Sequence, residues 1–311
     1  MGVRARRLVG VGLRAAMQYS STQSFVNASK ELDDICAWLR DIGIGYSSNR
    51  IGKYKELFSV LAEAQLSNNL DAYSQKFTTM DFINAIVERE QLARIYNGLG
   101  GLGEPKLIDR LKKASRGHAL FVMDSNDRSG RDFSLELDVA AKFARNGYEL
   151  DFGHDADVKA SRDGLCIFVE CKRLKSENNI RENIKKGLKQ LKNRYKTADS
   201  PADCRGLLAL SIGKVVNPDF GFLLGRDVAD ISAQCKRHAD AFLSKYSRYW
   251  LYEGIDHRSV GVAMLMDAPG KTTERDIPFS LHEIAISNIA RPASPNYEQL
   301  MEICKVFEPK H

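Results

Sequence analysis

Two pairs of charged residues stand on either side of a short turn, and each pair has the two-residue spacing of one strand face. Asp155 and Asp157 precede the turn, while Glu170 and Lys172 follow it. Side chains two positions apart on a strand point the same way. Burying acids beside a lysine is costly unless a cation compensates the carboxylates. The pattern therefore predicts a site for a hard divalent cation held by oxygen atoms.

A hairpin would bring the two pairs together. The expected turn covers residues 161–164, which places Ala160 opposite Leu165 and Asp155 opposite Glu170. Cross-strand partners share a face, so all four charged side chains should project to one side of the hairpin. The apolar run over residues 165–169 indicates that the returning arm is a central strand.

These residue types suit hydrolysis of a phosphodiester bond. Carboxylates at Asp157 and Glu170 can hold Mg²⁺ or Mn²⁺, which lowers the pKa of a water and stabilises charge on the phosphate. Lys172 can position or deprotonate the attacking water. A second metal would need one more acid, and Glu136 could supply it from a helix that packs on the sheet through Ala140 and Phe143. A structural salt-bridge ladder is the alternative interpretation.

The order Asp157, twelve intervening residues and then Val169-Glu170-Cys171-Lys172 resembles the PD-(D/E)XK signature of restriction-endonuclease-like nucleases. Ala156 stands where the original motif has proline, and Asp155 competes with Asp157 for the first acidic position. The resemblance implies that Asp157 and Glu170 are metal ligands, that the backbone carbonyl of Cys171 is a further ligand, and that Lys172 is the catalytic lysine. Glu136 matches a helical glutamate that many members carry, as catalytic residue and metal ligand.

A basic window follows the motif and indicates a polyanionic partner. Ten Lys or Arg residues lie between Lys172 and Lys196, against Glu177 and Glu182. We expect Lys185, Lys189, Lys192 and Gln190 to contact nucleic acid, DNA in preference to RNA. A solvated lysine-rich helix face is the alternative. Gln190 and Tyr195 are similar to a Gln and Tyr pair of the helicase-associated branch of the family, at a spacing one residue longer.

The elements that must position these residues form an α/β pattern. A helix is expected over 134–146, strands over 148–152, 155–160 and 165–172, and a helix over 180–196. A strand at 206–213, a helix at 228–249 and strands at 259–266 and 282–289 follow. The family resemblance implies a restriction-endonuclease-like core, a mixed β-sheet flanked by helices, over residues 104–311.

The chain before this core reads as a helical accessory domain over residues 26–100. Its third helix has capping-box spacing at Thr78 and Asp81, and Asn97 and Gly98 are expected to end it. The glycine-rich run over 98–103 predicts a linker. Residues 1–25, which contain four arginines and no acid, are a basic arm or a mitochondrial presequence.

Composition indicates the cellular compartment and the kinds of partner to expect. The chain has 311 residues, a formal net charge of +6 and six scattered cysteines without a CxxC pair. We expect reduced thiols and a cytoplasmic location, or a mitochondrial one if residues 1–25 are a presequence. No apolar run reaches the roughly 20 residues of a membrane span, so no membrane partner is expected. A homodimer, a protein partner of the N-terminal helices, and a nucleic-acid-binding module that does not cleave remain open.

Overall fold

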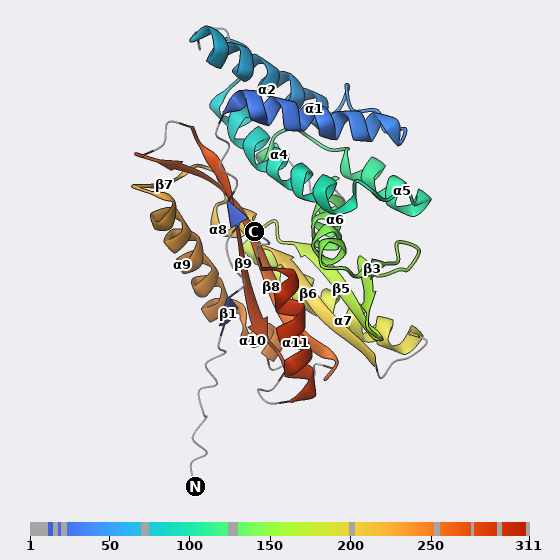
Figure 1. Cartoon of the computed structure of the whole chain (residues 1–311). Coiled ribbons are helices and arrows are strands. Elements are labelled where there is room, and N and C mark those ends of the chain that lie inside the picture. Colours follow the sequence, from blue (N-terminus) through green and yellow to red (C-terminus); the bar gives the residue numbers. More distant parts are fainter. Residues whose placement is uncertain are drawn as a thin grey trace.

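The protein folds around one mixed β-sheet with helices on both faces, which makes it an α/β protein (Figure 1). The computed structural model describes residues 12–14, 18–19, 24–69, 75–123, 130–198, 203–251, 256–274, 277–290 and 294–308. The α/β class and the helix-flanked mixed sheet expected from the sequence are thereby confirmed.

Parallel strands occupy the middle of the sheet. The strands are β1 (Gly12–Arg14), β2 (Gln18–Tyr19), β3 (Glu149–Leu150), β4 (Val158–Arg162), β5 (Leu165–Arg173), β6 (Cys204–Ser211), β7 (Leu223–Gly225), β8 (Ser259–Thr272) and β9 (Phe279–Asn288). Their order is β1-β9-β8-β6-β5-β4-β3, with β2 beside β9 and β7 beside β8. β5, β6 and β8 run parallel to one another, whereas β4 and β9 run antiparallel to their neighbours. Strands buried on both faces need apolar residues throughout, as in β5 and β6.

Helices cover the two faces of this sheet. They are α1 (Phe25–Asp41), α2 (Arg50–Ser67), α4 (Thr79–Leu99), α5 (Pro105–Ala114), α6 (Gly130–Arg145), α7 (Ile180–Thr197), α8 (Gly213–Val216), α9 (Val228–Tyr246), α10 (Arg248–Leu251) and α11 (Pro295–Val306), with short 3-10 turns at Phe121–Met123 and Glu177–Asn179. Successive side chains along a strand point to opposite faces of the sheet, so the apolar core has one part on each face. Val169 and Leu207 pack with α4 and α6, while Phe168 and Leu208 pack on the other face with α7 and α9.

The N-terminal helices share their core with the sheet. Residues from α1, α2 and α4 belong to the same buried apolar cluster as residues from α6, β5 and β6. Glu88 of α4 is buried between Arg50 of α2 and Arg131 of α6 and pairs with both guanidiniums. Since a buried carboxylate is stable only with compensating charge, this trio ties the three helices together.

Two features of α4 compare directly with the sequence expectation. The capping box is confirmed, because Thr78 accepts from the Asp81 backbone while the Asp81 carboxylate accepts from that of Thr78. The expected end at Asn97 and Gly98 is wrong, since α4 continues to Leu99. Gly98 has a packing role instead: a Cβ there would lie 2.6 Å from the Cβ of Ala141, so only glycine lets α4 approach α6 this closely.

The hairpin that carries the acidic residues has a different register from the expected one. Ala160 pairs with Ile167, and Arg162 pairs with Leu165. The turn is therefore only Asp163-Gly164, both with positive φ, which suits the tight turn that matches strand twist. The observed register differs from the expected one by two residues. Because side chains alternate with a period of two, each residue of the hairpin stays on its expected face of the sheet. The same register, continued, sets Asp157 rather than Asp155 opposite Glu170.

The order of elements expected over residues 134–213 is observed as α6, β3, β4, β5, α7 and β6. Boundaries differ: α6 begins at Gly130, β4 begins at Val158, and β8 and β9 are longer than expected. Gly147, with φ of 76°, follows the end of α6 as predicted.

Part of the predicted N-terminal arm adds strands to the sheet. Gly12–Arg14 and Gln18–Tyr19 pair antiparallel with β9, while residues 1–11, 15–17 and 20–23 lie outside the described residues. Among the helices that the structure describes, none is both long enough and apolar enough to cross a membrane.

Candidate active site

Asp157 immediately precedes β4, at the point where the pairing of β4 with β5 ends. β4 begins only at Val158, so β5 has no antiparallel partner beyond Val169. The backbone N–H of Cys171 would be left without a strand partner there. It donates instead to Oδ2 of Asp157 at 2.7 Å. The carboxylate of Asp157 is thus fixed against β5 by the local end of the strand pairing.

Lys172 reaches both predicted metal-ligating acids. Its Nζ lies 3.3 Å from Oδ2 of Asp157 and 3.5 Å from Oε2 of Glu170, and it donates to the carbonyl of Cys171 at 2.9 Å. Burial alone would lower the pKa of Lys172, but the two carboxylates outweigh it and the pKa is raised. Lys172 therefore carries a positive charge between the two acids.

Glu170 is fully buried and has one oxygen without a hydrogen bond. Nε of Arg194, from α7, donates to Oε1 of Glu170 at 3.0 Å. Oε2 accepts no hydrogen bond. Burial, and next the negative charge of Asp157, raise the pKa of Glu170 to about 7. The ammonium of Lys172 lies 3.5 Å from this buried oxygen without donating a hydrogen bond to it, so a bound cation would compensate the carboxylate more fully.

Glu136 reaches the same region from α6. Its Oε2 lies 3.4 Å from Nη1 of Arg110, which comes from α5. Burial and the nearby Asp157 raise the pKa of Glu136 to about 8, although Arg110 and Lys172 act in the opposite direction. Burial and the shared neighbour Asp157 thus raise the pKa of both Glu136 and Glu170, and such clustered carboxyl groups are typical of a site that holds positive charge.

A cleft of about 790 Å³ opens over these residues. Its walls come from α5, α6, the loop before β4, the end of β5 and α7. The lining residues are Arg110, Lys113, Asp132, Phe133, Leu135, Glu136, His154, Asp155, Ala156, Asp157, Cys171, Lys172, Arg173, Lys175, Asn179, Asn183, Lys186, Gln190 and Arg194. Glu170 lies beneath this surface. Seven of the lining residues are cationic and four are acidic, which leaves the cleft positive.

The structure brings together most, but not all, of the predicted site residues. Glu136, Asp157, Cys171, Lys172 and Gln190 line the cleft, and Oε1 of Gln190 is buried without a hydrogen-bond partner. Lys185, Lys189 and Lys192 are not among the lining residues. The competing aspartate, Asp155, also lines the cleft, but its side chain is 92% exposed and its Oδ2 lies 3.9 Å from Nη1 of Arg194.

Six of the seven cationic residues that line the cleft were not among the candidate residues named from the sequence. Arg110 and Lys113 lie in a short helix at the start of the predicted core. The other four, Arg173, Lys175, Lys186 and Arg194, lie within the basic window, and Lys186 and Arg194 are on the side of α7 that faces the cleft. A signal for α7 was available. Residues 183, 186, 190 and 194 repeat every three or four positions, as one helix face does. For Arg110 the sequence carries no comparable signal.

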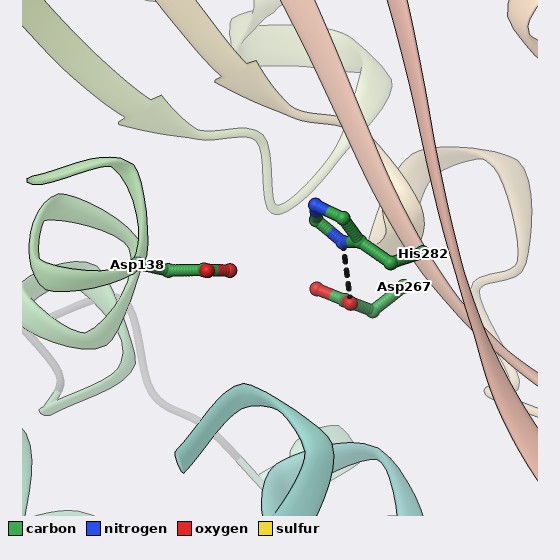
Figure 2. Close-up of side chains that lie close together, drawn as sticks. All are labelled: Asp138, Asp267 and His282. Carbon is green, nitrogen blue, oxygen red and sulfur yellow. Dashed lines mark hydrogen bonds and ion pairs between the residues drawn. The ribbon is translucent and has the colours of Figure 1, made fainter. Parts of the chain in front are cut away.

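A second cluster of ligand-type side chains lies on the other side of α6. Asp138, Asp267 and His282 have ligand atoms within 4.8 Å of one another, and the described residues contain no other such trio (Figure 2). Figure 2 shows His282 turned toward Asp267, with Asp138 approaching from its helix. Arg94 already bonds both acids, at 2.8 Å to Asp138 and 2.9 Å to Asp267. A metal there would compete with a buried guanidinium, so the cluster is better described as an ion-pair network.

The predicted ligands Asp157, Glu170 and Glu136 do not have their ligand atoms as close together as those of Asp138, Asp267 and His282. The ammonium of Lys172 lies between Asp157 and Glu170. The donor set still fits a hard cation, because its atoms are oxygens and because Oε2 of Glu170 lacks a hydrogen-bond partner. Comparison of the chain with family models, curated proteins and solved structures finds no match.

Proposed function

We propose that the protein is a metal-dependent nuclease that hydrolyses phosphodiester bonds in nucleic acid, with DNA preferred. The observation that carries the proposal is the meeting of Asp157, Glu170 and Lys172 at the floor of a positively charged cleft, where one oxygen of Glu170 is buried without a donor. Acid, acid and lysine in this arrangement support a PD-(D/E)XK site. The order α6, β3, β4, β5, α7, β6 supports a restriction-endonuclease-like core.

The metal ligands in this proposal are Asp157, Glu170 and the carbonyl of Cys171, with Glu136 for a second ion. Mg²⁺ or Mn²⁺ suits them because these ions prefer oxygen ligands. When bound, the cation would lower the pKa of the attacking water and neutralise charge that develops on the phosphate. Arg194 orients Glu170, and the N–H of Cys171 orients Asp157.

Lys172 acts in this proposal through its positive charge. In the metal-free site Asp157 and Glu170 raise its pKa, so there it is a poor proton acceptor near neutral pH. It can instead donate a hydrogen bond that holds the water in line with the scissile phosphate, and it can stabilise the negative charge of the transition state. Of the two roles, positioning and deprotonating the water, we therefore propose positioning.

The cleft supports a polyanionic substrate. Its excess of cationic side chains attracts phosphate groups irrespective of sequence. The chemistry acts on the phosphodiester, so RNA is a second substrate to be tested. A restriction-endonuclease-like module that binds nucleic acid without cleaving it is the alternative function, and intact Asp157, Glu170 and Lys172 favour the enzyme.

The decisive experiment is a cleavage assay on duplex DNA, single-stranded DNA and RNA with Mg²⁺, Mn²⁺ or a chelator. Asp157→Asn and Glu170→Gln preserve shape while removing ligand charge, so both should abolish metal binding, measured by calorimetry, and cleavage. Lys172→Ala should lower the cleavage rate at least 100-fold yet leave metal binding largely intact. Glu136→Gln should reduce rate more than nucleic-acid affinity.

Controls separate the alternatives. Lys196→Ala changes a lysine of α7 outside the cleft lining and should cleave like the wild type. If the wild type binds nucleic acid but cuts no substrate with either metal, the binding module replaces the nuclease. If it cuts and Lys172→Ala cuts equally well, the assigned active site is wrong.

A further inference from the structure

Two lysines on opposite walls of the cleft keep their charge available for a ligand. Lys113 projects from α5 and Lys186 from α7. Neither forms an ion pair with a carboxylate of the described residues, whereas each other cationic residue of the lining does. Nζ of Lys113 lies 5.3 Å from the ring centre of Phe133, and this cation–π contact fixes the lysine on the rim.

The reactive centre is recessed between these walls. The side chains of Asp157, Lys172 and Glu136 are only 20%, 13% and 16% exposed. Glu170 has no exposed surface. A phosphate must therefore enter the cleft to reach the acids, and its neighbours along the strand must pass close to both rims.

The α7 wall presents a row of polar side chains along the cleft. Asn183, Lys186, Gln190 and Arg194 all line it. From the first to the last they span about 16 Å, at roughly 1.5 Å of rise per residue. Amide and ammonium groups repeated on one helix face can follow a phosphate backbone. Oε1 of Gln190, buried without a partner, marks one position where a polar group of a ligand is expected.

We infer that the cleft accepts an unpaired nucleic-acid strand, with Lys113 and Lys186 contacting phosphates on the two sides of the scissile one. This inference rests on the proposed nuclease function and names its substrate class. A positively charged groove that follows a single backbone is the usual way in which proteins bind unpaired strands.

A duplex fits this geometry poorly. Double-stranded DNA is stiff, with a persistence length of about 50 nm, and keeps its phosphates on the outside of a broad cylinder. Bringing one of those phosphates to a floor enclosed by α5 and α7 would need local strand separation. An unpaired strand, an overhang or a frayed end bends without that cost, and so reaches Asp157 and Glu170 directly.

The test compares binding of single-stranded and blunt duplex oligonucleotides of the same sequence to the full chain with a chelator present, by fluorescence anisotropy. We expect the single strand to bind at least 10-fold more tightly. Lys113→Glu and Lys186→Glu should each weaken its binding about 10-fold. Lys113→Gln and Lys186→Gln should each reduce the slope of log affinity against log salt by about 0.7. Lys112→Glu and Lys196→Glu, matched changes outside the lining on the same helices, should alter affinity less than 2-fold.

Cleavage with Mg²⁺ then separates this inference from the nuclease function. A wild type that cuts duplex and single strand equally well, or that loses affinity on Lys189→Glu but not on Lys186→Glu, overturns the inference while the nuclease stands. Strong single-strand binding through Lys113 and Lys186 without cleavage supports the cleft as a strand site and overturns the nuclease. Absence of binding to any oligonucleotide overturns the inference as well.

Discussion

The guanidinium of Arg110 donates to the carbonyl oxygen of Ala156, with a distance of 3.1 Å between Nη2 and O. The same group donates to the carbonyl of Asp157 and lies 3.4 Å from Oε2 of Glu136. One side chain of α5 therefore holds the loop that presents Asp157 and also faces the acid on α6. Arg110 thus connects α5 to α6 and to the loop before β4 at the candidate reactive centre.

Replacing Arg110 should lower the rate of cleavage without unfolding the protein. Misplacement of a reacting group by about 1 Å can cost roughly 100-fold in rate. We expect Arg110→Ala to reduce kcat 10- to 100-fold with little change in KM, and Arg110→Lys to recover only part, because lysine cannot bridge several carbonyls. Lys112→Ala, on the outer side of α5, is the control. An unchanged kcat in Arg110→Ala would show that the loop needs no such support.

Asp155 and Asp157 should separate clearly in the same assay. Asp155→Asn changes a side chain that is 92% exposed, so cleavage should stay within 3-fold of the wild type. Asp157→Asn weakens the contact with the N–H of Cys171 and removes a carboxylate beside Lys172, so it should abolish cleavage. The reverse ranking would make Asp155 the ligand and would require the loop before β4 to rearrange.

The sequence predicts which charged residues meet in the cleft better than it predicts the register that brings them together. The spacing of Asp157, Glu170 and Lys172 suffices to place them on one side, because a register error of two residues preserves strand faces. It does not choose between Asp155 and Asp157, since that choice depends on where β4 begins. The turn at Asp163-Gly164 could have set the register, as Asp-Gly is a strong hairpin signal.

Contacts between distant segments explain what could not be predicted. Arg110 and Glu136 are 26 residues apart, and their contact follows from how α5 packs on α6. The basic window showed that α7 would be positive, but which of its lysines face the cleft depends on the rotation of the helix against β5 and β6. The apolar residues Ile184 and Leu191 fix that rotation, and they turn Lys186 rather than Lys189 toward the cleft.

Arg194 should stabilise the protein most when metal is absent. It is the hydrogen-bond donor to the buried carboxylate of Glu170. Arg194→Gln leaves the buried carboxylate of Glu170 with Lys172 as its remaining ion-pair partner, at 3.5 Å, so it should lower the free energy of unfolding by about 2 to 4 kcal/mol in chelator. Mg²⁺ binds only the folded state and should recover part of that loss. Thermal unfolding with and without Mg²⁺ measures both effects; equal loss under both conditions would contradict a metal site at Glu170.

The network around Arg94 should contribute strongly to stability and little to catalysis. Arg94 of α4 bridges Asp138 of α6 and Asp267 of β8, so it connects the N-terminal helices to the sheet (Figure 2 shows the two acids). Asp138→Asn should cost about 3 to 5 kcal/mol in the free energy of unfolding, because it leaves Arg94 partly unpaired in the interior. Urea unfolding gives this value. Retained cleavage per folded molecule would confirm that the network is not the active centre, whereas a specific loss of metal binding would favour a metal at this trio.

His282 should make the protein less stable as the pH falls below about 6.5. Its Nδ1 lies 2.8 Å from Asp267, and Nε2 is buried without a hydrogen bond. Burial lowers the pKa of His282, and Arg94 and Lys142 lower it further against the opposing effect of Asp267. The unfolded chain then binds a proton near pH 6.5 that the folded chain does not, so folding stability is lost as pH falls toward the lowered pKa.

Other groups titrate in the same pH range, so the effect of His282 is measured as the difference in unfolding free energy between the wild type and His282→Gln. The raised pKa values of Glu136 and Glu170 act in the opposite direction, since the folded state takes up protons there before the unfolded state does. We expect the stability of wild type relative to His282→Gln to fall on acidification from pH 7, by at most about 1.4 kcal/mol per pH unit. Urea unfolding of both proteins gives this difference when it is measured from about pH 7.5 to about pH 5. That range extends to both sides of the ordinary histidine pKa of about 6.5. A difference that stays constant with pH would mean that His282 takes up its proton equally well in the folded protein, with Asp267 compensating its burial.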